Sequence, residues 1–226
     1  MPLINVRGNV KEVERPLSGR AAKIGLVTLD LRFSSKIREA ASKFNAEVLH
    51  VADPSRLPLD VNVVITSREE SFRISRGTVL YRENFDSVED LVEKAVEASL
   101  VGSSYKNVVI AIDPGKSMGA VYLLDNKVIK SRRYGSVEVL TMDVKKFIKS
   151  HEDAEKKYIV IGAASEFRIV KKILSELERN LRGEGVTTIV SDESFTSKGL
   201  IPKVKGMSKD EYSALILSLK NLIRLK

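Results

Sequence analysis

Asp113 is the residue whose type and position most readily support catalysis. It ends an apolar run, VVIAID, that is typical of a buried β-strand, and Pro114-Gly115 then turn the chain. A strand holds such a carboxylate rigidly at the edge of a sheet, while Gly115 and Gly119 allow a phosphate to approach the backbone. Asp-Pro-Gly is equally an ordinary turn signal, so a purely structural role for Asp113 stays open at this stage.

Basic residues accompany this acid in the second half of the chain. The candidates for phosphate binding are Lys116, just after the turn, and three lysines of a Gly- and Pro-containing loop, Lys198, Lys203 and Lys205. Arg132 and Arg133 lie on an expected strand. Because adjacent residues of a strand point to opposite faces, only one of these two arginines can face the same site.

The charge distribution favours a polyanionic partner for the second half. The net charge of +8 lies entirely in residues 106–226, because residues 1–105 carry equal numbers of basic and acidic side chains. Nucleic acid would prefer that half. A basic surface that only serves solubility is the alternative.

Composition excludes several classes of protein. With 43% hydrophobic and 30% charged residues, the chain of 226 residues can bury a core, which argues against disorder. It has no apolar run long enough to cross a membrane and no signal-peptide pattern, so we expect a cytoplasmic protein without membrane contact. The absence of cysteine and glutamine beside abundant Lys, Arg and Glu is typical of a heat-adapted protein.

The cysteine and histidine content limits the kinds of metal site. The chain has no cysteine, and its two histidines, His50 and His151, are far apart in sequence. Disulfides, thiol catalysis and thiolate–metal sites are therefore excluded, and an imidazole-rich site is improbable. Any metal must bind to carboxylate oxygens.

Hydrophobic periodicity divides the chain into two α/β domains, 1–104 and 105–226. In the first, strands at 23–31, 46–52, 61–66 and 77–81 combine with helices at 34–44 and 87–100, the alternation of a small Rossmann-like domain. Residues 1–20 are expected to form a strand or arm. No GxGxxG precedes a helix here, and Asp30 is either a ligand or a strand end, so the role of this domain stays unknown.

The second domain has the expected order βββαβαβα. Its strands are predicted at 108–113, 119–125, 127–134, 158–163 and 185–190, and its helices at 137–150, 166–181 and 209–225. A tight turn at Asp125-Asn126 should join the second and third strands, so the first three are antiparallel and the sheet is mixed.

The second domain resembles a known superfamily. VVIAIDPGKSMGAVYLLDNKVI is similar to the opening hairpin of RNase H-like nucleases of the RuvC and YqgF type (Holliday junction resolvase-like), whose first strand ends in a metal-binding Asp. SDESFTS after the last strand resembles the second motif of YqgF-type members, Asp-Glu-Arg-x-Thr. DEYSALIL resembles their third, an Asp before a helix. The resemblance spans residue 107 to the C-terminus.

Carried over residue by residue, the resemblance implies Asp113, Glu193 and Asp210 as catalytic metal ligands, with Asp192 and Glu211 as adjacent substitutes. Two departures stand against it: Ser194 replaces the motif's Arg, and the fourth strand ends in Gly-Ala-Ala-Ser where RuvC-type enzymes carry a Glu. The nearest acid there is Glu166. Ser208 and Glu211 also form a capping-box spacing, so Asp210 is either a ligand or a residue of a helix start.

The function implied is a nuclease that uses Mg²⁺ (or Mn²⁺) to hydrolyse phosphodiester bonds in structured DNA or RNA. Two Mg²⁺ ions about 3.5–4 Å apart can activate water and stabilise the leaving oxygen, and they take hard oxygen ligands. Without metal, clustered acids would repel one another. The sequence also allows a homodimer.

Two other functions remain open. One is a non-catalytic module that binds nucleic acid or protein on an RNase H-like scaffold, which the two departures favour. The other is a sugar-kinase or actin-like ATPase, which shares the opening Asp-x-Gly hairpin. That architecture needs two such domains, and residues 1–105 show no second copy.

Overall fold

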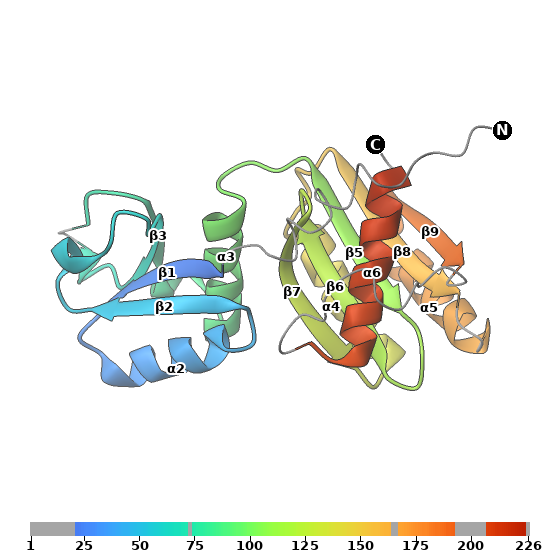
Figure 1. Ribbon diagram of the computed structural model, residues 1–226, viewed down its shortest axis with the longest axis horizontal. Coiled ribbons are helices and arrows are strands. Elements are labelled where there is room, and N and C mark those ends of the chain that lie inside the picture. Colours follow the sequence, from blue (N-terminus) through green and yellow to red (C-terminus); the bar gives the residue numbers. More distant parts are fainter. Residues whose placement is uncertain (1–20, 72–73, 164–166, 193–206, 225–226) are drawn as a thin grey trace, which may run out of the picture. The chain divides into compact units, whose positions relative to one another are not determined.

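The computed structural model describes residues 21–71, 74–163, 167–192 and 207–224 (Figure 1). The described residues up to Ser104 form one compact unit, and those from Tyr105 onward form the other. No helix within these ranges is long and apolar enough to span a membrane.

The N-terminal unit is built on a four-stranded, fully parallel sheet of order β2-β1-β3-β4. Its elements are β1 (Ala22–Val27), α2 (Leu31–Ala41), β2 (Ala46–Val51), η2 (Pro54–Arg56), β3 (Val63–Thr66), β4 (Thr78–Tyr81), η4 (Arg82–Asn84) and α3 (Val88–Leu100). Helices α2 and α3 pack against each other and against the sheet. The small Rossmann-like α/β class predicted for this part is confirmed.

The start of α2 differs from the expectation. The sequence predicted a strand to residue 31 and a helix from residue 34, but β1 ends at Val27 and α2 begins at Leu31. Thr28 Oγ1 accepts a hydrogen bond from Asp30 N at 3.0 Å, and Asp30 Oδ1 accepts one from Phe33 N at 3.0 Å. These two hydrogen bonds turn the chain after β1 and cap α2. The prediction missed this helix start because it used only the spacing of apolar residues.

The C-terminal unit has the predicted order of three strands followed by alternating helices and strands. Its elements are β5 (Asn107–Asp113), β6 (Met118–Leu124), β7 (Lys127–Tyr134), α4 (Val137–Lys149), β8 (Lys156–Ala163), α5 (Phe167–Asn180), β9 (Val186–Asp192) and α6 (Lys209–Arg224). Asp125 and Asn126 have φ angles of 43° and 69°, the conformation of the expected tight hairpin turn.

The sheet of this unit is mixed, with strand order β7-β6-β5-β8-β9. Strand β6 runs antiparallel to β5 and β7, whereas β5, β8 and β9 are parallel to one another. Element order and sheet type agree with the predicted RNase H-like class.

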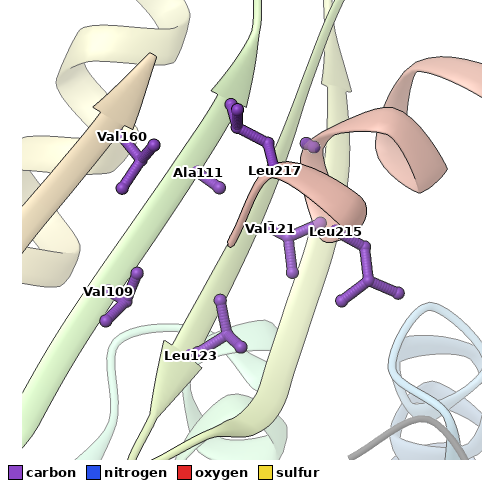
Figure 2. Packing of buried hydrophobic residues seen from close by; sticks show 8 residues of the cluster. Val109, Ala111, Val121, Leu123, Val160, Leu215 and Leu217 are labelled. Carbon is purple, nitrogen blue, oxygen red and sulfur yellow. The ribbon is translucent and has the colours of Figure 1, made fainter. Parts of the chain in front are cut away.

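Helix α6 covers one face of this sheet and packs on β5, β6 and β8, while α4 and α5 pack together on the other face (Figure 1). Figure 2 shows the α6 side, where Leu215 and Leu217 meet a layer of strand side chains formed by Val109, Ala111, Val121, Leu123 and Val160. Because β5 contributes every second residue to this layer, its side chains are sorted between the two faces by the strand period. The same alternation determines the face of the sheet on which Asp113, the last residue of β5, lies.

Candidate functional site

Asp113 is the last residue of β5 and is half-buried. Val109 and Ala111 belong to the core layer under α6. Because side chains alternate along a strand, Asp113 lies on that same face, at the carboxyl end of the strand. The predicted acid therefore stands where the sheet ends and α6 begins.

Gly119 of β6 pairs directly with Asp113 and brings α6 to it. An ideal β-carbon added to Gly119 would lie 2.6 Å from the backbone nitrogen of Glu211, and closer still to the carbonyl group of Asp210. The first turn of α6 thus rests on the bare backbone of β6, beside Asp113. Asp113 and Asp210, which are far apart in sequence, are brought to the same edge of the sheet.

The capping box predicted at the start of α6 is present. Ser208 N donates to Glu211 Oε2 at 2.8 Å, and Glu211 N donates to Ser208 Oγ at 3.3 Å. Glu211 is therefore engaged in closing the helix start, which weakens its case as a substitute ligand. Asp210 is the second residue of α6 and takes no part in this box.

The other predicted acids lie at or after the ends of β8 and β9 in the sequence. Strands β8 and β9 end at Ala163 and Asp192, which pair with each other near the edge that carries Asp113. Glu193, Glu166 and the loop lysines Lys198, Lys203 and Lys205 lie outside the described residues. Within the described ranges, no group of three or more Asp, Glu, His or Cys side chains is arranged to hold a metal ion.

Three cationic side chains come from the elements that surround Asp113 and Asp210. Lys116, a predicted phosphate ligand, is exposed in the turn after β5, and Lys209 is exposed as the first residue of α6. The third is Arg133, which pairs with Gly119 and is exposed. Sequence reasoning did not single out Lys209, although its position beside Asp210 was the available signal.

Arg132 belongs to the opposite face of the sheet. Its guanidinium lies 3.5 Å from Asp143 Oδ2 on α4, and Lys130 Nζ lies 3.1 Å from Asp143 Oδ1. Tyr134 donates its hydroxyl hydrogen to Asp143 and shares a hydrogen bond of 2.7 Å with Tyr122. These residues form a buried polar network between β6, β7 and α4, away from the face that carries Asp113.

Burial and neighbouring groups shift the pKa values of two residues of this network, Asp143 and Tyr134. Burial alone would raise the pKa of Asp143, but the charge of Lys130 and the hydrogen bond from Tyr134 outweigh it and lower that pKa. Burial also raises the pKa of Tyr134 well above its usual range, and the neighbouring Asp143 charge adds to this. Both groups therefore keep one protonation state across the physiological range, which is typical of a structural network.

Two acidic residues that follow strands of the N-terminal sheet, Asp30 and Glu70, bond to groups of the same unit. Asp30, left open as a ligand or a strand end, caps α2 and forms an ion pair with Arg82 at 3.2 Å. Glu70 accepts hydrogen bonds from Leu29 N at 2.6 Å and from Ser67 Oγ at 3.0 Å. Asp30 and Glu70 are thus used in local structure.

Comparison with known proteins gives structural matches alone. No protein-family model and no curated protein sequence matches the chain. A solved structure of T. thermophilus RuvC in complex with a Holliday junction substrate aligns over 52% of this chain and 94% of its own, with 10% identity and a TM-score of 0.39. A polyphosphate/ATP-glucomannokinase from Arthrobacter sp. strain KM aligns over 83% of this chain and 79% of its own, with 12% identity and a TM-score of 0.23. At these TM-scores neither match identifies an activity.

Proposed function

We propose that the C-terminal unit binds structured DNA or RNA and hydrolyses its phosphodiester bonds with Mg²⁺ or Mn²⁺. One observation supports this proposal: Gly119 pairs with Asp113 and lies against the backbone of Asp210, so the backbones of two acids from distant parts of the sequence lie at one sheet edge. In this proposal the two carboxylates approach each other closely enough to share a cation, which offsets their mutual repulsion.

The donor set fits a hard divalent cation. Asp113 and Asp210 offer carboxylate oxygens, and the chain has no cysteine to provide a softer ligand. Glu193, which follows the last residue of β9, is the third ligand in this proposal. When bound, such ions supply an activated water and stabilise the leaving oxygen.

The chain's own residues position the substrate. Strand β5 and the first turn of α6 hold Asp113 and Asp210 on rigid elements, so little rearrangement is needed to bind a cation. Lys116, in the turn after β5, and Lys209, the first residue of α6, are both exposed and attract phosphate oxygens in this proposal. Lys198, Lys203 and Lys205 are assigned the same role. The N-terminal domain, residues 1–104, is given no catalytic role.

The test compares Asp113→Asn with Glu178→Gln, a change of an exposed acid on α5. Each full-length protein is incubated with a four-way DNA junction or a stem-loop RNA, with Mg²⁺ and with EDTA. Asp113→Asn should abolish cleavage and keep nucleic-acid binding, and Glu178→Gln should change neither. Hydrolysis that persists in Asp113→Asn would falsify the assignment.

A non-catalytic nucleic-acid-binding or protein-binding module is the second candidate, and the end of β8 favours it. That strand ends in Gly162 and Ala163, so its described part offers no carboxylate at this edge. Such a module would bind nucleic acid equally well with and without Mg²⁺ and would cleave neither substrate. A nuclease would lose cleavage in EDTA.

A further inference from the structure

The side chains of the two adjacent arginines of β7, Arg132 and Arg133, lie on opposite faces of the sheet. Arg132 and Tyr134 both contact Asp143 of α4, so their side chains lie on the α4 face. Arg133 stands between them in the strand and therefore points to the opposite face, the one covered by α6. This settles which of the two arginines shares a face with Asp113.

Arg133 also lies in the same cross-strand row as Asp113. Asp113 of β5 pairs with Gly119 of β6, and Gly119 pairs with Arg133 of β7. The backbone of Asp210 rests on the glycine in the middle of this row. Asp113 and Arg133 therefore flank the first turn of α6 from its two sides.

The local electrostatics leave Arg133 available to a ligand. Arg132 is drawn to Asp143, whereas Arg133 is exposed and forms no ion pair with any residue of the described ranges. A guanidinium presents a planar fork of donors that matches phosphate oxygens, and the N-terminal turn of a helix also favours negative charge. Lys209, exposed in that turn, adds a second positive charge.

We propose that Arg133 binds a backbone phosphate near the cleaved one, so that nucleic acid passes the first turn of α6 and crosses toward the β7 side of the sheet. This inference rests on the proposed function. Two strand spacings place the backbones of Asp113 and Arg133 about 10 Å apart. At about 3.4 Å of axis rise per charge on one strand, that span covers roughly three phosphates. Arg133 therefore contributes to binding and does not touch the reacting atoms.

Fluorescence anisotropy in EDTA tests this role without cleavage. The probes are a labelled four-way DNA junction and a labelled stem-loop RNA, titrated with the full-length protein at several KCl concentrations. Arg133→Ala should raise Kd about tenfold, the loss expected for one charged hydrogen bond. The slope of log K against log [KCl] should become shallower by about one, the signature of one lost phosphate contact. The probe that the wild-type protein binds with the lower Kd is the preferred nucleic acid.

Lys127→Ala is the matched control, because Lys127 is an exposed basic residue at the other end of β7. It should leave Kd and the salt slope unchanged. Arg133→Lys should restore most of the slope, since the charge is kept, but only part of the affinity, since the fork of donors is lost. The cleavage rate at saturating protein should stay within about twofold of wild type in Arg133→Ala, as expected for a contact made equally in ground and transition states.

The outcomes separate this inference from the proposed function. If the wild-type protein binds and cleaves while Arg133→Ala keeps the wild-type salt slope, the role of Arg133 is overturned and the nuclease proposal stands. The role of Arg133 is also overturned if Lys127→Ala raises Kd and changes the salt slope equally, because Arg133 would then act only through the net charge of the protein. If the wild-type protein binds neither probe, the proposed function itself is wrong.

Discussion

The α-carbon of Gly119 lies against the peptide bond that joins Asp210 to Glu211. A β-carbon on Gly119 would meet Glu211 N at 2.6 Å, and this obstacle is backbone that cannot swing away. Gly119 therefore sets how closely α6 approaches β6. Because Asp113 pairs with this glycine, the same contact sets the separation of the two acids.

Gly119→Ala should displace the start of α6. We expect the free energy of unfolding, measured by urea titration, to fall by about 1–3 kcal/mol, as for other overpacked sites. Cleavage should fall more than nucleic-acid binding, because Asp210 moves away from Asp113. Gly135→Ala is the control, since a β-carbon there meets no atom of the described residues within 4 Å. Equal behaviour of the two variants would contradict the close packing.

Asp210 and Glu211 are neighbours that should respond differently to loss of charge. Glu211 is committed to the capping box with Ser208, and glutamine can fill the same role. We therefore expect Glu211→Gln to retain Mg²⁺-dependent cleavage and to lose less than about 1 kcal/mol of stability. Asp210→Asn should lose cleavage with its thermal midpoint little changed. The reverse pattern would make Glu211 the ligand.

The buried ion pair of Lys130 and Asp143 should be sensitive to removal of one partner. Their side chains are 3% and 13% exposed, and Lys130 also lies over the Tyr122 ring, 4.6 Å from its centre. Asp143→Asn leaves the Lys130 charge buried without its carboxylate, so the free energy of unfolding should fall by about 3–5 kcal/mol.

The double variant Lys130→Met/Asp143→Asn separates charge from packing. It removes the uncompensated cation, and we expect it to be more stable than Asp143→Asn alone in the same urea titration. If the double variant is less stable, packing of Lys130 against its aromatic neighbours outweighs the charge. Circular dichroism before denaturation confirms that both variants fold.

The sequence predicted the order of elements well, because apolar periodicity and turn residues are local signals. It placed the hairpin at Asp125-Asn126 and the capping box of α6, and it raised the question of which arginine faces the site. It could not answer that question, since the answer depends on contacts with Asp143 in a different element. It named Gly119 as a place for close approach to a phosphate, whereas the backbone of Asp210 occupies that position. Such pairings between distant segments have no local signature.

The pH dependence of stability offers a separate test of the Asp143 network. The pKa of Asp143 is lowered in the folded state, because Lys130 and the hydrogen bond from Tyr134 outweigh the effect of burial. The folded state therefore binds its proton less tightly than the unfolded state, whose carboxyl has a pKa of about 3.9. The contribution to stability is fully present above that pH and is lost as pH falls through the folded pKa.

We expect the difference in unfolding free energy between wild type and Asp143→Asn to be constant from about pH 7 to pH 5 and to narrow below about pH 4. Urea titrations at successive pH values measure it. Glu178→Gln, which changes an exposed acid outside the network, corrects for the general effect of removing a carboxylate. If burial instead dominated and raised the folded-state pKa of Asp143, wild type would gain stability relative to Asp143→Asn as the pH falls from 7 to 5, because the folded state would then bind the proton more tightly. A difference that grows in this way would mean that the buried Asp143 charge costs stability at neutral pH, because its neighbours would not compensate for its desolvation.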